Sequence, residues 1–427
     1  MMPHKGFLFS LSLKGSKLLP QQRLTMMRKR IATTVVGLAA AGGAVLAGEG
    51  TSLDGGGGDW CRLLTDDLGA PLYSNDDAML IQAMKFFGRA QVQFASVDVD
   101  GIGGVDDSET FDEVRRLRLG TQLQVLQHFK VKVNANLVSD GKPNGGSRDY
   151  GYQSLDVALV SFDAGALLGG GALDGVNVSV GRHKVGMSYE VHTSSKKIKT
   201  VERSAVANKV YPARLTGITA KKAMGNFSGT IGAFSTESTP ELASDTGGLA
   251  LYASGALDLG NGDKLIADFL HNDAYGTADN EVGLYDWALA LAYLTERNGW
   301  DLLLQGTIGD NGDDGQGQRG GDFWGFVAMA SRDLIADKLE AVVRYSAQGS
   351  DEAEGIRSNS RYFRRSKHTA NVNSGRGDAH QSIYAGLNYF VCGHNAKIMT
   401  GVEWESLEAP AGDADALTLW LAFRTYF

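Results

Sequence analysis

Basic side chains are concentrated in one part of an otherwise acidic chain. Between residues 181 and 222 the sequence has ten Lys or Arg residues and only two acids, Glu190 and Glu202. The run HTSSKKIKTVERS at 192–204 adds two adjacent serines, Ser194 and Ser195. Guanidinium and ammonium donors combined with hydroxyls suit the binding of oxyanions. The run therefore indicates an anion site, although a solvated loop is the usual explanation of a charge run.

The segments around this run alternate in polarity as β-strands do. In 117–125 one face is mainly Leu and Val, and the other is Arg, Gly and Gln. In 129–137 one face is entirely apolar, and the other is Lys and Asn. A soluble sandwich turns the polar face to water, whereas a membrane barrel turns the apolar face to lipid and the polar face to a wet lumen. Periodicity alone leaves both architectures open.

The number of such segments favours the barrel. Together with 56 glycines and only 7 prolines, the alternation predicts many strands joined by turns. Single-chain bacterial barrels have an even number of strands, and sixteen segments are predicted: 83–97, 114–125, 129–139, 151–162, 176–184, 214–222, 226–236, 248–258, 264–272, 282–295, 300–309, 321–332, 338–347, 381–391, 397–406 and 415–427.

The connections and the end of the chain point the same way. Short turns alternate with long polar loops, as in outer-membrane barrels. The first three long loops are predicted at 98–113, 140–150 and 185–213. The last strand ends in LTLWLAFRTYF, which is similar to the C-terminal assembly signal of bacterial outer-membrane proteins. We therefore predict an all-β fold, a transmembrane antiparallel β-barrel of about 16 strands.

The beginning of the chain resembles an export signal. Arg28, Lys29 and Arg30 precede a short apolar run and the sequence Val45-Leu46-Ala47. A transmembrane anchor is the alternative, but the run is shorter than the roughly 20 residues a helical span needs. We predict a leader with a signal peptide at 1–47, a periplasmic N-terminal linker at 48–80 and the barrel at 81–427.

Charge and cysteine content exclude other classes. The net charge is -8, and the predicted leader is purely basic, so the mature chain is more acidic still. This argues against a nucleic-acid partner. Cys61 and Cys392 lack metal-ligand spacing, and their spacing does not indicate a disulfide, although an exported protein could form one. The acid-rich segments 98–109 and 310–315 do not match a calcium-binding loop, and no metal or cofactor is expected.

Three pieces of the sequence resemble one known family, the phosphate-selective porins O and P. They are FDEVRRLRLG at 111–120, VSVGRHKVGMSYEVHTSSKKIKTVERS at 178–204, and the final strands from IYAGLNYF at 383–390 to FRTYF. The resemblance implies a homotrimer whose long third loop inserts into the barrel and presents paired serines and an arginine to the anion. By motif position these are Ser194, Ser195 and Arg203.

One position departs from the family pattern. Members of the family have a lysine shortly before the serines, and Val191 stands there in this chain. Lys196, Lys197 and Lys199 follow the serines instead. We expect these three lysines to belong to the constriction loop. The departure concerns phosphate selectivity more than the passage of anions.

Strand alternation predicts the pore-lining cations. Arg89 shares a face with Lys85, Gln91 and Gln93, opposite Phe86 and Phe94. The predicted pore-lining set is Arg89, Arg116, Arg118, Lys130, Lys132 and Arg344. Arg115 should point away from the lumen and sit at the rim. The alternative is that lumen arginines pair with acids such as Glu340 and Asp268 and only stabilise the wall.

Catalysis is not expected from this pattern. Five histidines (His183, His192, His271, His380 and His394) could contribute, but nothing in the sequence places one beside a nucleophile. The Arg-rich stretch 357–367 lies in an outer loop, where it would draw anions to the mouth or bind lipid head groups.

We therefore predict an outer-membrane porin for passive diffusion of small anions, phosphate or polyphosphate-like, with no cofactor. Its other partners would be outer-membrane lipid and lipopolysaccharide. A general diffusion porin without solute specificity is the alternative. An exported soluble β-protein that binds an acidic ligand is a further one.

Overall fold

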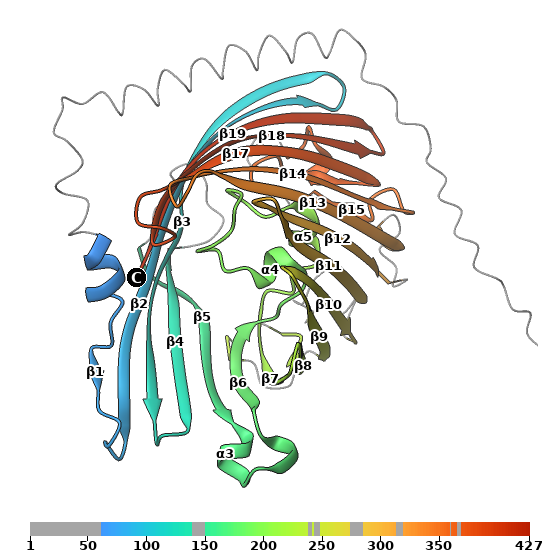
Figure 1. Ribbon diagram of the computed structural model, residues 1–427. Helices are drawn as coiled ribbons and strands as arrows, with labels where there is room; N and C mark the ends of the chain where they lie inside the picture. Colours follow the sequence, from blue (N-terminus) through green and yellow to red (C-terminus); the bar gives the residue numbers. More distant parts are fainter. Residues whose placement is uncertain are drawn as a thin grey trace, which may run out of the picture. The chain divides into compact units, whose positions relative to one another are not determined.

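The chain folds into a closed barrel of antiparallel strands. The computed structural model describes residues 61–138, 150–237, 241–242, 248–273, 285–312, 319–358, 360–364 and 369–427. Within these residues sixteen strands make up the barrel (Figure 1). They are β2 (Ile81–Gly101), β3 (Val105–Val125), β4 (Phe129–Val138), β5 (Tyr150–Asp163), β6 (Val176–Lys184), β7 (Arg214–Met224), β8 (Phe227–Ser235), β9 (Leu249–Gly260), β10 (Asp263–Asn272), β11 (Trp287–Arg297), β12 (Trp300–Asp310), β13 (Asp322–Ile335), β14 (Leu339–Ser350), β17 (Ala379–Phe390), β18 (Ala396–Ala409) and β19 (Gly412–Tyr426).

The last strand pairs with the first and closes the ring. β19 runs antiparallel to β2, from the pair Asp415 and Asp100 to the pair Tyr426 and Arg89. Phe427 continues this seam, because its backbone N–H and C=O both bond to Gly88. A closed barrel leaves no strand edge unpaired, which a hydrocarbon environment requires. All sixteen predicted strands, the barrel and the closing role of the C-terminal strand are confirmed.

The prediction of an outward loop at 98–113 is wrong. β2 and β3 continue through this region and are joined by a turn at 102–104, where Gly103 and Gly104 adopt positive φ. Val97, Val99 and Phe111 face inward and are buried in the hydrophobic core. The alternation therefore persists here, and the many aspartates between the buried residues hid it from the sequence analysis.

The outer surface of the barrel is apolar. Large side chains such as Phe86, Phe94, Leu119 and Ile231 are exposed on it, whereas Gln91 and Gln93 on the other face of β2 are buried. Exposed apolar side chains on one face and polar ones on the inner face are the membrane-barrel pattern, which excludes the soluble sandwich. In the described part of the chain, no helix is long and apolar enough to cross a membrane.

Connections differ in length at the two rims. Turns of two to five residues join β3 to β4, β7 to β8, β9 to β10, β11 to β12, β13 to β14 and β17 to β18. An exception on this rim is 164–175, which holds the short helices α3 (Ala164–Leu168) and η2 (Gly171–Leu173). On the other rim, 185–213 and 351–378 are long. A two-stranded sheet of β15 (Ile356–Arg357) and β16 (Arg376–Gly377) lies in the second of these loops.

The two cysteines form a disulfide that the sequence did not indicate. Cys61 is bonded to Cys392, 331 residues away in the sequence. Cys61 precedes η1 (Leu63–Asp67) and β1 (Tyr73–Ser74), and β1 adds a short pairing to β2. Cys392 lies in the turn between β17 and β18. The bond therefore ties the segment before the barrel to the rim with the short turns.

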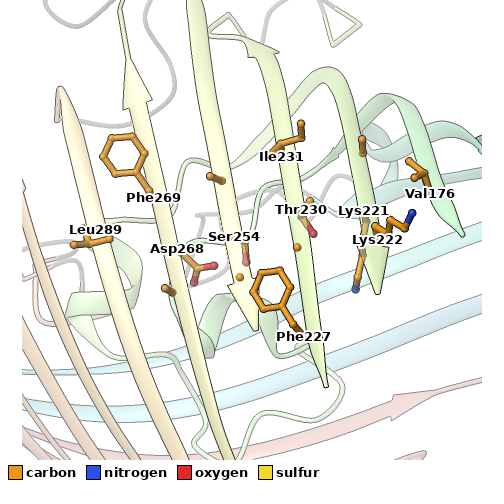
Figure 2. A pocket seen from close by; sticks show the side chains of 15 residues that line it. Val176, Lys221, Lys222, Phe227, Thr230, Ile231, Ser254, Asp268, Phe269 and Leu289 are labelled. Carbon is orange, nitrogen blue, oxygen red and sulfur yellow. The ribbon is translucent and has the colours of Figure 1, made fainter. Parts of the chain in front are cut away.

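A cavity of about 600 Å³ lies at the wall formed by β7–β10. Figure 2 shows Phe227, Ile231, Phe269 and Leu289 around it. Gly229 and Gly255 also line it and contribute no side chain, so the wall is thin there. Because these large apolar side chains are exposed on the outer surface, the cavity is a depression that opens toward lipid and is not part of a polar lumen.

The seam between β2 and β19 depends on the missing side chain of Gly88. A Cβ atom there would lie 2.7 Å from two ring carbons of Phe427 and 2.9 Å from a methyl group of Leu119. We expect Gly88→Ala to destabilise the barrel by about 1–3 kcal/mol, as overpacking does. The measurement is the temperature at which gel migration changes from the folded to the unfolded form. Gly306→Ala is the control, because nothing lies within 4 Å of a Cβ at Gly306. Equal temperatures for the two variants would contradict the expectation.

Candidate functional site

The loop after β6 lies inside the barrel. It contains α4 (Tyr189–His192) and α5 (Ala205–Lys209), both within the ring of strands in Figure 1. Its backbone accepts hydrogen bonds from lumen side chains on opposite walls, including Gln91 of β2 and Lys397 of β18. Its apolar side chains Val191 and Val201 are buried. The basic segment is therefore surrounded by barrel wall rather than by solvent.

Arg344 of β14 anchors this loop. Its guanidinium lies 2.9 Å from the Glu190 carboxylate and donates to the Thr200 hydroxyl and the Glu202 carbonyl, each at 2.9 Å. The other side of the guanidinium binds Glu403 of β18 at 3.0 Å. Arg344 is only 1% exposed. It was predicted to line the pore, but the structure places it beneath the loop, where its charge is neutralised.

The Glu202 carboxylate holds the loop on the opposite wall. It binds Arg115 of β3 at 2.7 Å and accepts from Gln93 of β2 at 2.9 Å. Burial would raise the pKa of this carboxyl, but the charges of Arg115, Arg116 and Arg361 hold it well below the usual range. Glu202 therefore remains ionised.

The prediction that Arg115 points away from the lumen is wrong, and a β-bulge is the reason. Gln91 of β2 pairs with Arg116, but the next residue, Val92, pairs with Val114. Arg115 is thus an extra residue on β3. A bulge breaks the alternation of sides, so that Arg115 and Arg116 are both buried on the lumen side.

Carboxylates neutralise several of the predicted cations. Arg118 lies 2.8 Å from Asp156 of β5, which also binds Arg214 at 2.9 Å. Lys199 lies 2.6 Å from Asp301 and 2.8 Å from Glu340. For these residues and Arg344, the structure favours the alternative of wall stabilisation. Asp268 instead binds His192, at 2.8 Å.

A second set of lumen cations has no carboxylate within salt-bridge distance in the described part of the chain. Arg89 donates to the Ser195 hydroxyl at 2.7 Å, and Arg116 donates to the Gln91 side chain at 2.8 Å. Arg203 binds only the carbonyls of Glu190, at 2.6 Å, and Thr193, at 2.9 Å. These guanidiniums keep their positive charge unneutralised.

Ser195 lies at the centre of this set. Its carbonyl accepts from Gln91 at 3.1 Å and from Arg424 of β19 at 3.2 Å, in addition to the Arg89 contact with its hydroxyl. Ser194 beside it is half-buried, and its hydroxyl accepts from the backbone of Lys196 at 3.4 Å. Because each serine hydroxyl accepts in these bonds, its own proton remains available for donation.

Lys184 was not identified as a site residue from the sequence. It ends β6, is half-buried, and donates to the carbonyl of Val191. Val191 itself is buried. A lysine amino group therefore lies beside the position where the family pattern has a lysine, supplied by a neighbouring strand.

The remaining predicted lysines differ in exposure. Lys196 is half-buried and lies 4.1 Å from the centre of the Tyr426 ring. Lys132 is half-buried and lies 5.0 Å from that of Phe87, whereas Lys130 and Lys197 are exposed. Burial, and then the charges of Arg89, Lys132 and Lys85, lower the pKa of Lys196 to about 8. Lys196 is thus part of a strongly cationic surface.

Three of the five histidines are bound to acids. His192 lies 2.8 Å from Asp268, His271 lies 3.4 Å from Asp286, and His380 lies 3.2 Å from Glu405. Among the described residues, no group of three or more His, Cys, Asp or Glu side chains is placed to hold a metal ion. The arrangement can bind and pass anions through donors that carry positive charge.

Comparisons with known proteins agree with this architecture. Residues 84–285 match the model of the family described as phosphate-selective porin O and P. This confirms the family resemblance seen in the sequence, and the matched region includes Arg89, Lys184 and the whole inserted loop. The match spans just under half of the chain, so the chain resembles this family and has the barrel fold of outer-membrane porins. No curated protein matches it by sequence.

Solved structures show the same fold at low sequence identity. OmpT of Vibrio cholerae is 10% identical with a TM-score of 0.52, covering 81% of this chain and 97% of its own. An anion-selective porin from Comamonas acidovorans is 13% identical with a TM-score of 0.53, covering 81% and 99%. The channel DcaP of Acinetobacter baumannii is 13% identical with a TM-score of 0.51, covering 81% and 97%. These similarities establish the fold alone.

The pKa of Lys196 predicts a pH dependence. Below about pH 8 its ammonium carries a charge, and above that pH the charge is lost. Attraction of anions to the lumen should therefore weaken as the pH rises through 8. The measurement is the reversal potential of single channels in a salt gradient between pH 6 and 9. Lys196→Arg should remove the change in this range, and Lys196→Met should show the weaker attraction at every pH. A wild-type profile that Lys196→Arg leaves unchanged would exclude Lys196 as the cause.

Proposed function

We propose that this porin is a passive channel for small anions and that phosphate-like oxyanions are its preferred solutes. The observation that carries the proposal is the set of basic side chains around Ser195 that have no carboxylate within salt-bridge distance among the described residues. Arg89 binds the hydroxyl of Ser195, while Arg203 and Lys184 donate to backbone carbonyls of the same loop. The charges of Arg89 and Arg203 act on each other and on Lys184.

The chemistry of this set suits an anion in transit. An anion that enters a constriction loses part of its hydration shell and needs donors in its place. A guanidinium offers several N–H groups in one plane, which match two oxygens of an oxyanion. The hydroxyls of Ser194 and Ser195 add donors without adding charge. Binding of the anion must also stay weak enough for release. The backbone carbonyls that already accept from Arg203 and Lys184 compete with the anion for these donors and so limit its affinity.

The proposal includes the route to the membrane and the assembly. Residues 1–47 would direct export and 48–80 would lie in the periplasm as a linker. The apolar outer surface would contact outer-membrane lipid and lipopolysaccharide. The chain would assemble as a homotrimer; one of the similar solved structures, OmpT of Vibrio cholerae, is described in a trimer form. Catalysis has no part in this function.

A general diffusion porin is the second candidate, and Val191 is the observation that favours it. The buried side chain of Val191 offers no donor where the family pattern has a lysine. If Lys184 does not replace that donor, the lumen would attract anions without preferring phosphate.

The test is single-channel recording in planar bilayers. The purified channel should be chloride-selective in a salt gradient, and low concentrations of phosphate should block the chloride current. Chloride selectivity without block would support the general porin. Cation selectivity would show that the acidic groups dominate and would overturn the proposal.

Variants then test the residues. Lys184→Met, Ser195→Ala and Arg203→Ala should each weaken phosphate block by about tenfold, the effect of one charge-assisted hydrogen bond. Lys222→Met is the matched control, because Lys222 also donates to a carbonyl, that of Ala172, but is bound at the short-turn rim. Heat-modifiable migration must be unchanged in all four variants, since Arg203 also holds the loop. Block that stays at the wild-type level in Lys184→Met would remove Lys184 from the site.

A further inference from the structure

Polar side chains that face the lumen differ in exposure between two walls. On the first half of β2 and on β4 and β6, Lys85, Arg89, Lys132 and Lys184 are half-buried and therefore reached by solvent. On β10–β19 the lumen side is covered. Polar residues there that are at most 3% exposed include Asp268, Gln305, Ser331, Arg344, Ser382, Glu405 and Thr418. Water therefore reaches these four basic side chains of the first wall, although Asn134 of β4 and Asp156 of β5 are buried there, and the other wall is filled.

The loop at 351–378 covers much of the filled wall. Tyr362 and Phe363 in this loop are fully buried. The Tyr362 ring stacks on Phe111 of β3, with ring centres 4.5 Å apart, and contacts Trp420 of β19 at 5.3 Å. Ser360 donates to Glu405 of β18 at 2.7 Å. This outer loop thus reaches inside the barrel from β3 to β18.

An ion pair fixes the loop in this position. Arg361 donates to the Glu113 carboxylate of β3 through Nε at 3.0 Å, and its Nη2 binds the same carboxylate. The Tyr362 hydroxyl donates to Glu113 as well, at 2.7 Å. Both side chains of the ion pair are less than a tenth exposed. The predicted role of this arginine in binding lipid head groups is therefore wrong for Arg361.

The two inserted loops meet at one side chain. The amide nitrogen of Gln93 donates to Glu202 of the first loop at 2.9 Å and to the Tyr362 hydroxyl of the second at 3.0 Å. Val201 and Val210 of the first loop and Ile356 and Val372 of the second belong to the same hydrophobic core. The loops thus pack as one body against the wall.

We propose that the described parts of this loop, 351–358, 360–364 and 369–378, form a wedge that closes the lumen along β14–β19 and confines permeation to the wall of β2–β6. That the permeating solute is an anion is taken from the proposed function, on which this part of the inference rests. Every ion that crosses must then pass Arg89 and Lys184. The wedge makes the channel selective for anions, because the path that it leaves open runs along the cationic wall of β2–β6.

The charge of the covered wall explains why a wedge matters there. Glu340, Glu403 and Glu405 face the lumen from β14 and β18. Arg344, Lys397 and Arg424 of this wall are already bound to the first loop. A second path along this wall would run past the carboxylates. It would admit cations and let anions bypass the Ser195 site.

The experiment compares Tyr362→Ala and Arg361→Ala with the unsubstituted channel in planar bilayers. Opening the covered wall adds a parallel path, so conductance should rise by a factor on the order of two. Anion selectivity, measured as reversal potential, should fall, and phosphate block should become incomplete. Glu113→Gln breaks the same ion pair with little change of shape and should act in the same direction. It keeps the test open if an alanine variant fails to fold.

Arg297→Ala is the matched control, because Arg297 forms an ion pair with Asp263 at 2.7 Å on the short-turn rim that does not involve the loop at 351–378. It should leave conductance and selectivity unchanged. Unchanged conductance in folded barrels of Tyr362→Ala or Glu113→Gln would overturn the wedge. Higher conductance with an unchanged reversal potential would overturn it too, because the loop would then only narrow the existing path. If the unsubstituted channel is cation-selective, the proposed function fails, and the conductance change alone decides on the wedge.

Discussion

The guanidinium of Arg344 connects the barrel wall to the loop that carries the site. It binds two acids from different parts of the fold, Glu190 in the loop and Glu403 in β18, and two oxygens of the loop segment 200–202. Removing one partner of a buried ion pair leaves an uncompensated charge and costs several kcal/mol. The position of the loop, and through it the positions of Ser195 and Arg203, therefore depends on Arg344 together with Arg115, which holds Glu202 on the opposite wall.

Strand alternation was visible in the sequence because each strand separates two solvents. Lipid on one side and water or polar groups on the other impose a period of two, and the sixteen strands follow from it. Alternation gave the wrong side of the barrel wall where the side that a residue faces depends on the pairing with a neighbouring strand. Arg115 faces the lumen because β3 has one residue more than β2 at that point, which no local pattern shows. The β2–β3 hairpin was missed because the aspartates at 98, 100, 106 and 107 and the glycines between them resemble a loop.

The sequence predicted the residue types of the site, but it did not predict which of its cations are paired with carboxylates. The run 192–204 and the lumen face of β2 placed Ser195, Arg203 and Arg89 in one set. Whether an arginine is available or neutralised depends on acids far along the chain. Arg344 and Glu190 are 154 residues apart, and Arg361 and Glu113 are 248 apart. Such pairs form only in the folded barrel. For the same reason Lys184, which reaches the loop from the end of a strand, had no mark in the sequence beyond its charge.

The disulfide gives the chain a covalent topology of its own. Residues 61–392 form a closed ring that contains β2–β14 and β17, and only β18 and β19 lie beyond it. Every long outer loop, including both that enter the lumen, belongs to this ring. A single break in the backbone of any of these loops would leave all sixteen strands in one covalently connected molecule. The loops that face the exterior can therefore be cut once without releasing a fragment of the barrel.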